Sequence, residues 1–336
     1  MNSWIERAQQ LSDEVFAPHA DAVDRTGVIP AQHFDLLAAN GFYGATMSDD
    51  LDIATFSEVG EILVAGCLAT TFVWAQHLGV ARRIATSPNH ELRESLTEDL
   101  RHGRVRSGVS YAGADDRASL VAHRVNGGYL LHGSAPFVTG WGLIDVIGVM
   151  ARDADDPHSL ISAMIPALDG PAVRSTALPL AAADASRTVK LTFDGLFVPD
   201  SAVDNRISLR SFHASFILAA WRNGSLSLGV VRRVRTELTR LGLDATALAA
   251  ESARVRTELD DSLSGQSDIY LARAHASELA VRAASTLVAA IGSGAAQRGG
   301  IADRTLREAG FTLVFGSRPP IRTALLDLLA GPIPAR

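Results

Sequence analysis

The chain has 336 residues, of which 47% are hydrophobic and 20% are charged, and its formal net charge at pH 7 is −6. A chain of this length buries a large core without covalent support, and the single cysteine, Cys67, excludes an internal disulfide and a cysteine-based zinc cluster. The negative charge argues against nucleic-acid binding. Because the N-terminus lacks the apolar segment of a secretory signal and no apolar run approaches roughly 18 residues, we expect a cytoplasmic protein that does not bind membranes.

The first part of the chain, residues 1–104, has apolar residues at helical spacing, as in Val59, Ile62 and Leu63. This pattern predicts an N-terminal helical domain of four or five helices. Residues 105–205 instead contain short β-branched or alternating runs separated by Gly, Asp, Asn and Pro. The sequence Asn-Gly-Gly at 126–128 is the strongest hairpin signal in the chain. We therefore predict a middle β domain over residues 105–205.

Helical spacing returns after this region, which predicts a C-terminal helical domain over residues 206–336. An alanine-rich segment predicts a long helix over about 268–291, and "SRPP" at 317–320 predicts a break between the last two helices. The expected fold is mainly α with an inserted β domain: an N-terminal helical domain, a middle barrel or sandwich, and a C-terminal helical bundle.

The spacing of residues excludes several known site motifs. "GSGAAQ" at 292–297 has Gln297 at the third glycine position of a dinucleotide-binding fingerprint and follows a predicted helix rather than a strand. The ten histidines include no pair at metal-ligand spacing, so we expect no metal site. His77 lies in an apolar helical segment, where a histidine is more often a hydrogen-bonded packing residue than a catalyst. We keep His77 as a secondary catalytic candidate.

Four segments in order resemble the acyl-CoA dehydrogenase family of flavoproteins. Residues 16–47, "FAPHADAVDRTGVIPAQHFDLLAANGFYGATM", are similar to the opening helices of that family. Residues 104–116, "RVRSGVSYAGADD", resemble the first strand of its middle domain. Residues 124–152, "RVNGGYLLHGSAPFVTGWGLIDVIGVMAR", resemble the hairpin that carries an aromatic-x-Thr segment, and residues 194–203, "DGLFVPDSAV", resemble the exit from the β domain. The resemblance extends over nearly the whole chain and implies the same fold.

The resemblance also implies an FAD site. By position, Phe137 would pack beside the isoalloxazine ring, and the Thr139 hydroxyl would hydrogen-bond near N5. Val109, Ser110 and Tyr111 match the strand that contacts the pyrimidine edge of the flavin. These assignments fit the needs of a flavin, which are a flat apolar wall and a few directed hydrogen bonds.

Other features of the family concern the FAD diphosphate and the assembly of subunits. Arg235 loosely matches one diphosphate-binding segment, and Gly292 and Gly294 match a second, which the family supplies from a neighbouring subunit. The resemblance implies a homodimer or homotetramer. A hetero-oligomer with a second dehydrogenase-like subunit is the alternative.

The general base of the family has no counterpart at its two usual positions. Such dehydrogenases remove the α-proton of the substrate with a glutamate, but Phe315 or Gly316 occupies its C-terminal position. The segment after the β domain has no Asp or Glu between Asn205 and Glu237. We expect an FAD-dependent oxidoreductase acting on an acyl-CoA or related substrate with an atypical or missing base. Two alternatives stay open: a non-catalytic subunit that pairs with a complete acyl-CoA dehydrogenase, and a flavin-dependent monooxygenase in which His77 or His213 serves as a polar group.

Overall fold

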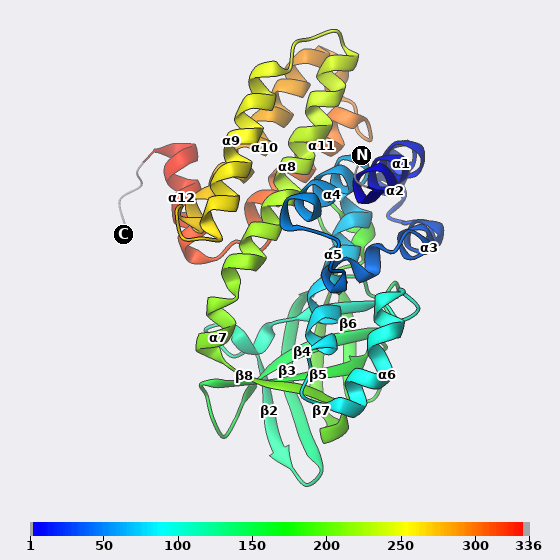
Figure 1. Cartoon of the computed structure of the whole chain (residues 1–336), viewed down its shortest axis with the longest axis vertical. Helices are drawn as coiled ribbons and strands as arrows, with labels where there is room; N and C mark the ends of the chain where they lie inside the picture. The colour runs from blue at the N-terminus through cyan, green and yellow to red at the C-terminus, as the bar shows by residue number, and fades with distance from the viewer. Residues whose placement is uncertain (1–2, 332–336) are drawn as a thin grey trace.

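Helices and strands occupy separate stretches of the chain. The structure, a computed structural model, describes residues 3–331. Figure 1 shows the β region at one end of the molecule, the C-terminal helices at the other, and the N-terminal helices between them. The division of the chain into domains at residues 104 and 205 stays a prediction, but helices give way to strands between Arg101 and Ser107, and strands give way to helices after Ser208.

The N-terminal region holds more helices than the four or five expected. Over the described residues these are α1 (Ser3–Leu11), α2 (Ala17–Thr26), α3 (Ala31–Ala39), α4 (Ile53–Gly66), α5 (Leu68–Ala85) and α6 (His90–Arg101). A π-helical turn over Ser12–Phe16 joins α1 to α2, so these two are almost one continuous helix. Side-chain caps begin two others, since Asp52 accepts from Thr55 N at 2.7 Å before α4 and Asn89 accepts from Leu92 N at 3.1 Å before α6. Helix α5 packs against α4, α6, β1 and α8 and so links all three regions.

The middle region forms one connected sheet. Its strands are β1 (Ser107–Ser110), β2 (Leu120–Val125), β3 (Gly128–Val138), β4 (Val146–Asp153), β5 (Ser159–Pro166), β6 (Val173–Ala177), β7 (Val189–Pro199) and β8 (Val203–Ser208). Their order is β6-β7-β3-β2-β4-β5-β8, and β1 pairs parallel with β4. The predicted hairpin is confirmed, because β2 and β3 pair antiparallel around Asn126 and Gly127, with Gly127 at φ +77°.

The C-terminal region is a helical bundle. It contains α7 (Leu209–Ala214), α8 (Phe216–Arg240), α9 (Thr246–Ser262), α10 (Ile269–Ile291), α11 (Ile301–Val314) and α12 (Pro319–Ala330). Helix α10 packs against α8, α9, α11 and α12, and Ala272, Ala276 and Ala280 on it are buried. Within residues 3–331, the segment Ile269–Ala296 is the one long and apolar enough to cross a membrane, judged by length and composition alone. This segment differs from our expectation that no apolar run in the chain approaches roughly 18 residues.

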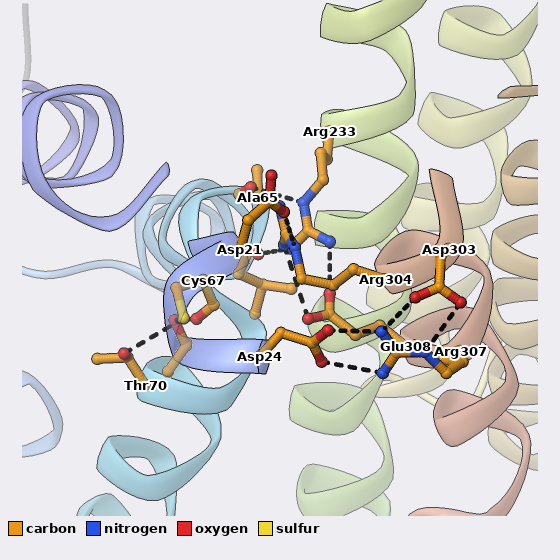
Figure 2. Close-up of polar contacts among 12 residues, drawn as sticks. Asp21, Asp24, Ala65, Cys67, Thr70, Arg233, Asp303, Arg304, Arg307 and Glu308 are labelled. Carbon is orange, nitrogen blue, oxygen red and sulfur yellow. Dashed lines mark hydrogen bonds and ion pairs between the residues drawn. The ribbon is translucent and has the colours of Figure 1, made fainter. Parts of the chain in front are cut away.

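A buried ionic network fastens the N-terminal helices to the C-terminal bundle (Figure 2). Arg233 on α8 pairs with Glu308 on α11 and also donates to the carbonyl oxygens of Val64 and Ala65 at the end of α4. Arg304 on α11 donates to Asp21 on α2 at 2.8 Å. Arg233, Glu308 and Arg304 are nearly inaccessible to solvent. A buried ion pair is costly to break, so this network holds α2, α4, α8 and α11 in a fixed arrangement.

Candidate functional site

A cavity of about 790 Å³ lies where α5, the end of β1, the β3 bulge, α8 and the loop between α11 and α12 meet. Apolar and aromatic side chains from all of these elements form much of its wall. They include Phe72, Trp74, Leu78, Tyr111, Phe137, Phe216, Leu226 and Phe315. A large apolar cavity with a few polar groups is the ordinary form of a small-molecule site, and this cavity brings Val109, Ser110, Tyr111, Phe137, Phe315 and Gly316 together from the sequence predictions.

Phe137 is the most unusual residue of the cavity wall. The β3–β7 register shifts between Ala135 and Val138, and this bulge places Phe137 at φ +58° with 67% of its surface exposed. A bulky residue rarely adopts such a backbone conformation, which costs about 1–3 kcal/mol. Tyr111, also on the cavity wall, is 45% exposed. The chain therefore keeps two large aromatic rings solvent-accessible at one cavity.

Thr139 lies two residues beyond the bulge, but its side chain is buried. Its Oγ1 is 3.1 Å from Thr188 Oγ1, and Thr188 Oγ1 is 2.9 Å from Ser186 Oγ. Thr139 is not among the residues that line the cavity. The Thr139 hydroxyl thus contacts Thr188 in the structure, whereas we expected this hydroxyl to hydrogen-bond near N5 of the flavin.

His77 is a packing residue in this structure. Its Nδ1 accepts from Ser107 N at 3.1 Å, so the ring proton is on Nε2, which donates to Leu100 O at 3.0 Å. Burial lowers the pKa of His77 to about 3. The residue does not line the cavity, and the neutral ring joins α5 to β1 and to the end of α6.

His213, the other histidine candidate, also lies outside the cavity lining. It is exposed on α7, and its Nδ1 accepts from Arg318 at 3.1 Å. Phe212 beside it does line the cavity, and the Arg318 guanidinium stacks on Phe216 at 3.7 Å. The structure therefore places His213 at the rim of the site, where it contacts a lining residue.

The two candidates for the missing glutamate have different roles. Phe315 follows the last residue of α11, and its ring packs edge-on against Phe72 at 4.7 Å and stacks with Phe311 at 5.6 Å. Gly316 has φ +60°, and a Cβ built on it would lie 2.5 Å from Asn223 Nδ2 on α8. Phe315 therefore belongs to an aromatic cluster, while Gly316 faces a polar side chain of α8.

A buried arginine fixes this loop. Arg273 on α10 donates to Thr312 O at 3.0 Å and to Phe315 O at 3.3 Å, which satisfies carbonyl groups at the end of α11. Burial lowers the pKa of Arg273 to about 10. Arg273 therefore positions Phe315 and Gly316 at the cavity without lining it.

The charged groups of the cavity wall are mostly cationic. Among the described lining residues, Asp115 is the carboxylate, and it accepts from Ser119 Oγ at 2.6 Å and Ser119 N at 3.0 Å. Arg83, Arg222 and Arg318 are the cations. Neither Arg222 nor Arg318 belongs to a sequence motif, and only the packing of α8 and α12 brings them to the cavity, so no local signal in the sequence identifies them.

Arg235, Gly292 and Gly294 lie elsewhere. Arg235 lines a second cavity of about 610 Å³ near the other end of α8, roughly 13 Å along the helix axis from the last α8 residue of the first cavity, at 1.5 Å per residue. Gly292, at φ +70°, ends α10, and Gly294 lies in the 3-10 segment that follows. The structure does not bring these three residues to the first cavity within one chain.

Comparison with known proteins gave both sequence and structural relatives. No family model matches the chain. The chain is 29% identical over 245 residues to the benzylmalonyl-CoA dehydrogenase of Aromatoleum aromaticum, a match that covers 66% of this chain and 63% of that relative. The chain thus spans less than two thirds of the curated relative's length.

Solved structures match over almost the whole chain. The butyryl-CoA dehydrogenase of Megasphaera elsdenii has a TM-score of 0.83 at 17% identity and matches over 96% of this chain and 95% of its own. A glutaryl-CoA dehydrogenase in complex with glutaryl-CoA has a TM-score of 0.83 at 16% identity, with 98% and 94% covered. The FAD complex of PigA has a TM-score of 0.82 at 17% identity, with 98% and 97% covered. The likeness therefore concerns the complete arrangement of helices and strands.

Proposed function

Because this chain has the fold of the acyl-CoA dehydrogenases and is similar in sequence to one of them, we propose that it is an FAD-dependent oxidoreductase. Its substrate is an acyl-CoA or a related compound, and it lacks the usual carboxylate base. The observation that carries the proposal is the pair of exposed aromatic residues, Phe137 and Tyr111, that the chain presents at a large apolar cavity.

The cavity wall suits a flat aromatic group. The strained backbone of Phe137 turns its ring out of the sheet, and Tyr111, Val109 and Ser110 line the same cavity. In this proposal these four residues hold the isoalloxazine ring, and Thr139 supports the bulge from beneath through Thr188. The flavin, when bound, would accept a hydride from the substrate.

The acyl part of the substrate would occupy the apolar region between α5, α8 and the α11–α12 loop. Phe72, Leu78 and Phe315 line this region and would exclude water from the reacting carbon atoms. Gly316 offers no proton acceptor there, and the Asp115 carboxylate already accepts two hydrogen bonds from Ser119. We therefore propose that no side chain at position 316 removes the α-proton of the substrate.

A second copy of the chain would complete the cofactor site. Arg235, Gly292 and Gly294 do not line the cavity of their own chain, so we assign the FAD diphosphate contact to these residues in another subunit. Leu326, Leu328 and Leu329 on α12 are exposed and provide an apolar surface for assembly. Sedimentation of FAD-loaded wild-type protein tests this assignment: a dimer or tetramer supports it, and an FAD-loaded monomer contradicts it.

The test of the activity is anaerobic mixing of FAD-loaded protein with acyl-CoA substrates while the visible flavin absorption is recorded. Bleaching by an acyl-CoA supports the proposed reaction. Stable absorption with every acyl-CoA, in a protein that binds FAD tightly, would contradict the reaction and favour the non-catalytic subunit. Chemically reduced protein that consumes oxygen and hydroxylates a substrate would favour the monooxygenase.

A further inference from the structure

Arg222 is a cation of the cavity wall that pairs with no anion among residues 3–331. It lies on α8 and lines the cavity, and no carboxylate of the described residues forms an ion pair with it. The other two lining arginines are engaged, since Arg83 pairs with Asp204 at 2.7 Å and Arg318 stacks on Phe216 and donates to His213. Burial lowers the pKa of the Arg222 guanidinium below its usual value. A partly buried cation without a counter-ion costs free energy, which an anionic ligand would recover.

Three elements converge at this guanidinium. A Cβ built on Gly79 of α5 would lie 4.0 Å from Arg222 Nη2 and 3.8 Å from the hydroxyl oxygen of Tyr111. The guanidinium of α8 and the phenol at the end of β1 thus approach the same point, and the glycine at position 79 leaves that point free of a side chain. An arginine nitrogen and a hydroxyl placed in this way can each donate to an oxygen of one carboxylate.

We propose that Arg222 and the Tyr111 hydroxyl, converging over Gly79, bind a carboxylate carried by the acyl group of the substrate. This inference rests on the proposed function, because it names the class of acyl-CoA that the site takes: one with a free carboxylate on its acyl chain. Arginine recognises a carboxylate through charge-assisted hydrogen bonds, whereas a substrate without that group would leave the guanidinium unpaired in the cavity. The subsite therefore selects against simple fatty acyl groups.

Calorimetric binding with matched ligands tests the proposal. The ligand pairs differ only by one carboxylate: glutaryl-CoA against butyryl-CoA, and benzylmalonyl-CoA against 3-phenylpropanoyl-CoA. The wild-type, FAD-treated protein should bind the carboxylated member of at least one pair about tenfold more tightly or better. Arg222→Met should abolish that preference, Arg222→Lys should keep part of it, and Tyr111→Phe should reduce it. Arg174→Met, at an exposed arginine of β6, is the control and should keep the full preference.

The outcomes separate this inference from the function on which it rests. An unchanged preference of Arg222→Met for the carboxylated ligands would overturn the carboxylate subsite. Loss of FAD from Arg222→Met while Arg174→Met retains FAD would also overturn it, because Arg222 would then bind the flavin. Free benzylmalonate provides a probe that does not depend on CoA. If the wild type binds no acyl-CoA but binds benzylmalonate, and Arg222→Met does not, the subsite stands and the proposed acyl-CoA substrate is wrong. If neither compound binds in an Arg222-dependent way, the subsite is wrong.

Discussion

Gly316 lies against Asn223 so closely that a Cβ on the glycine would be 2.5 Å from the amide nitrogen of the asparagine. Gly316 also has φ +60°, a conformation that glycine adopts without strain. The end of α11 is therefore built around the absence of a side chain at this position. Phe315 and Gly316 are the two residues at the position of the family's glutamate. We expect a glutamate substituted at Gly316, rather than at Phe315, to place its carboxylate in the cavity beside α8.

Gly316→Glu combined with Asn223→Ala should add a base to the site. The second change removes the amide that a new Cβ would contact, so the double variant should tolerate the carboxylate better than Gly316→Glu alone. A positioned base contributes about 10²- to 10⁴-fold, and we expect flavin reduction by an acyl-CoA to rise by about 10²-fold. Gly310→Glu is the control, because a Cβ on Gly310 in α11 meets no atom of the described residues within 4 Å outside its own helix turn. An equal rise in Gly310→Glu, or no rise in the double variant, would contradict this view of the site.

Phe315→Glu should fail to supply the base. Its ring packs on Phe72 and Phe311, and replacing a packed aromatic residue with a charged one removes apolar contacts and desolvates a carboxylate. We expect a lower free energy of unfolding, by about 1–3 kcal/mol, and no gain in flavin reduction. Urea unfolding and anaerobic reduction measure the two effects. A stable variant with raised activity would place the base at position 315 instead.

Phe137→Ala should weaken FAD binding while leaving the fold intact. The exposed ring contributes little to the core, whereas loss of an aromatic stacking partner should raise the dissociation constant for FAD about tenfold. Phe197→Ala is the matched control, since the Phe197 side chain on β7 is likewise exposed, at 50%, but does not line the cavity. Fluorescence titration with FAD distinguishes the two variants. Equal FAD affinity in wild type and Phe137→Ala would remove Phe137 from the flavin site.

Glu308→Gln should destabilise the protein without changing the cavity. The substitution leaves the buried guanidinium of Arg233 without its charge partner and weakens the longer ion pair with Arg304 at 3.7 Å. Breaking a buried pair from one side typically costs about 3–5 kcal/mol. Asp200→Asn, which breaks the exposed pair with Arg124, should change the unfolding midpoint far less. Similar shifts in both variants would show that the network in Figure 2 adds no stability of its own.

His77 should make the protein acid-sensitive. Its pKa is about 3 in the folded protein, below the value near 6.5 of an unfolded histidine. The unfolded state therefore binds a proton first as the pH falls, so the contribution of His77 is complete above about pH 6.5 and is lost progressively toward pH 3, by up to about 1.4 kcal/mol per pH unit. His77→Gln should flatten this slope in urea unfolding measured between pH 4 and 7. An unchanged slope would show that His77 does not control acid stability.

The order of elements was predictable because it depends on local signals. Asn126 and Gly127 specify a tight hairpin, and Gly292 follows the last residue of α10 as expected. The predicted break between the last two helices falls between Val314, where α11 ends, and Pro319, where α12 begins. The site was only partly predictable. Arg222 and Tyr111 are far apart in the sequence and meet only because α8 crosses the sheet end near α5, and nothing local to Thr139 signals that Thr188 covers its hydroxyl.

The central claim is that the aromatic cavity binds FAD, and the most direct measurement is the visible absorption spectrum of the purified protein after incubation with FAD and desalting. We expect flavin bands that survive desalting in wild type and Phe197→Ala and are reduced in Phe137→Ala. A wild-type protein that retains no flavin and also leaves the fluorescence of added FAD unchanged would contradict the account.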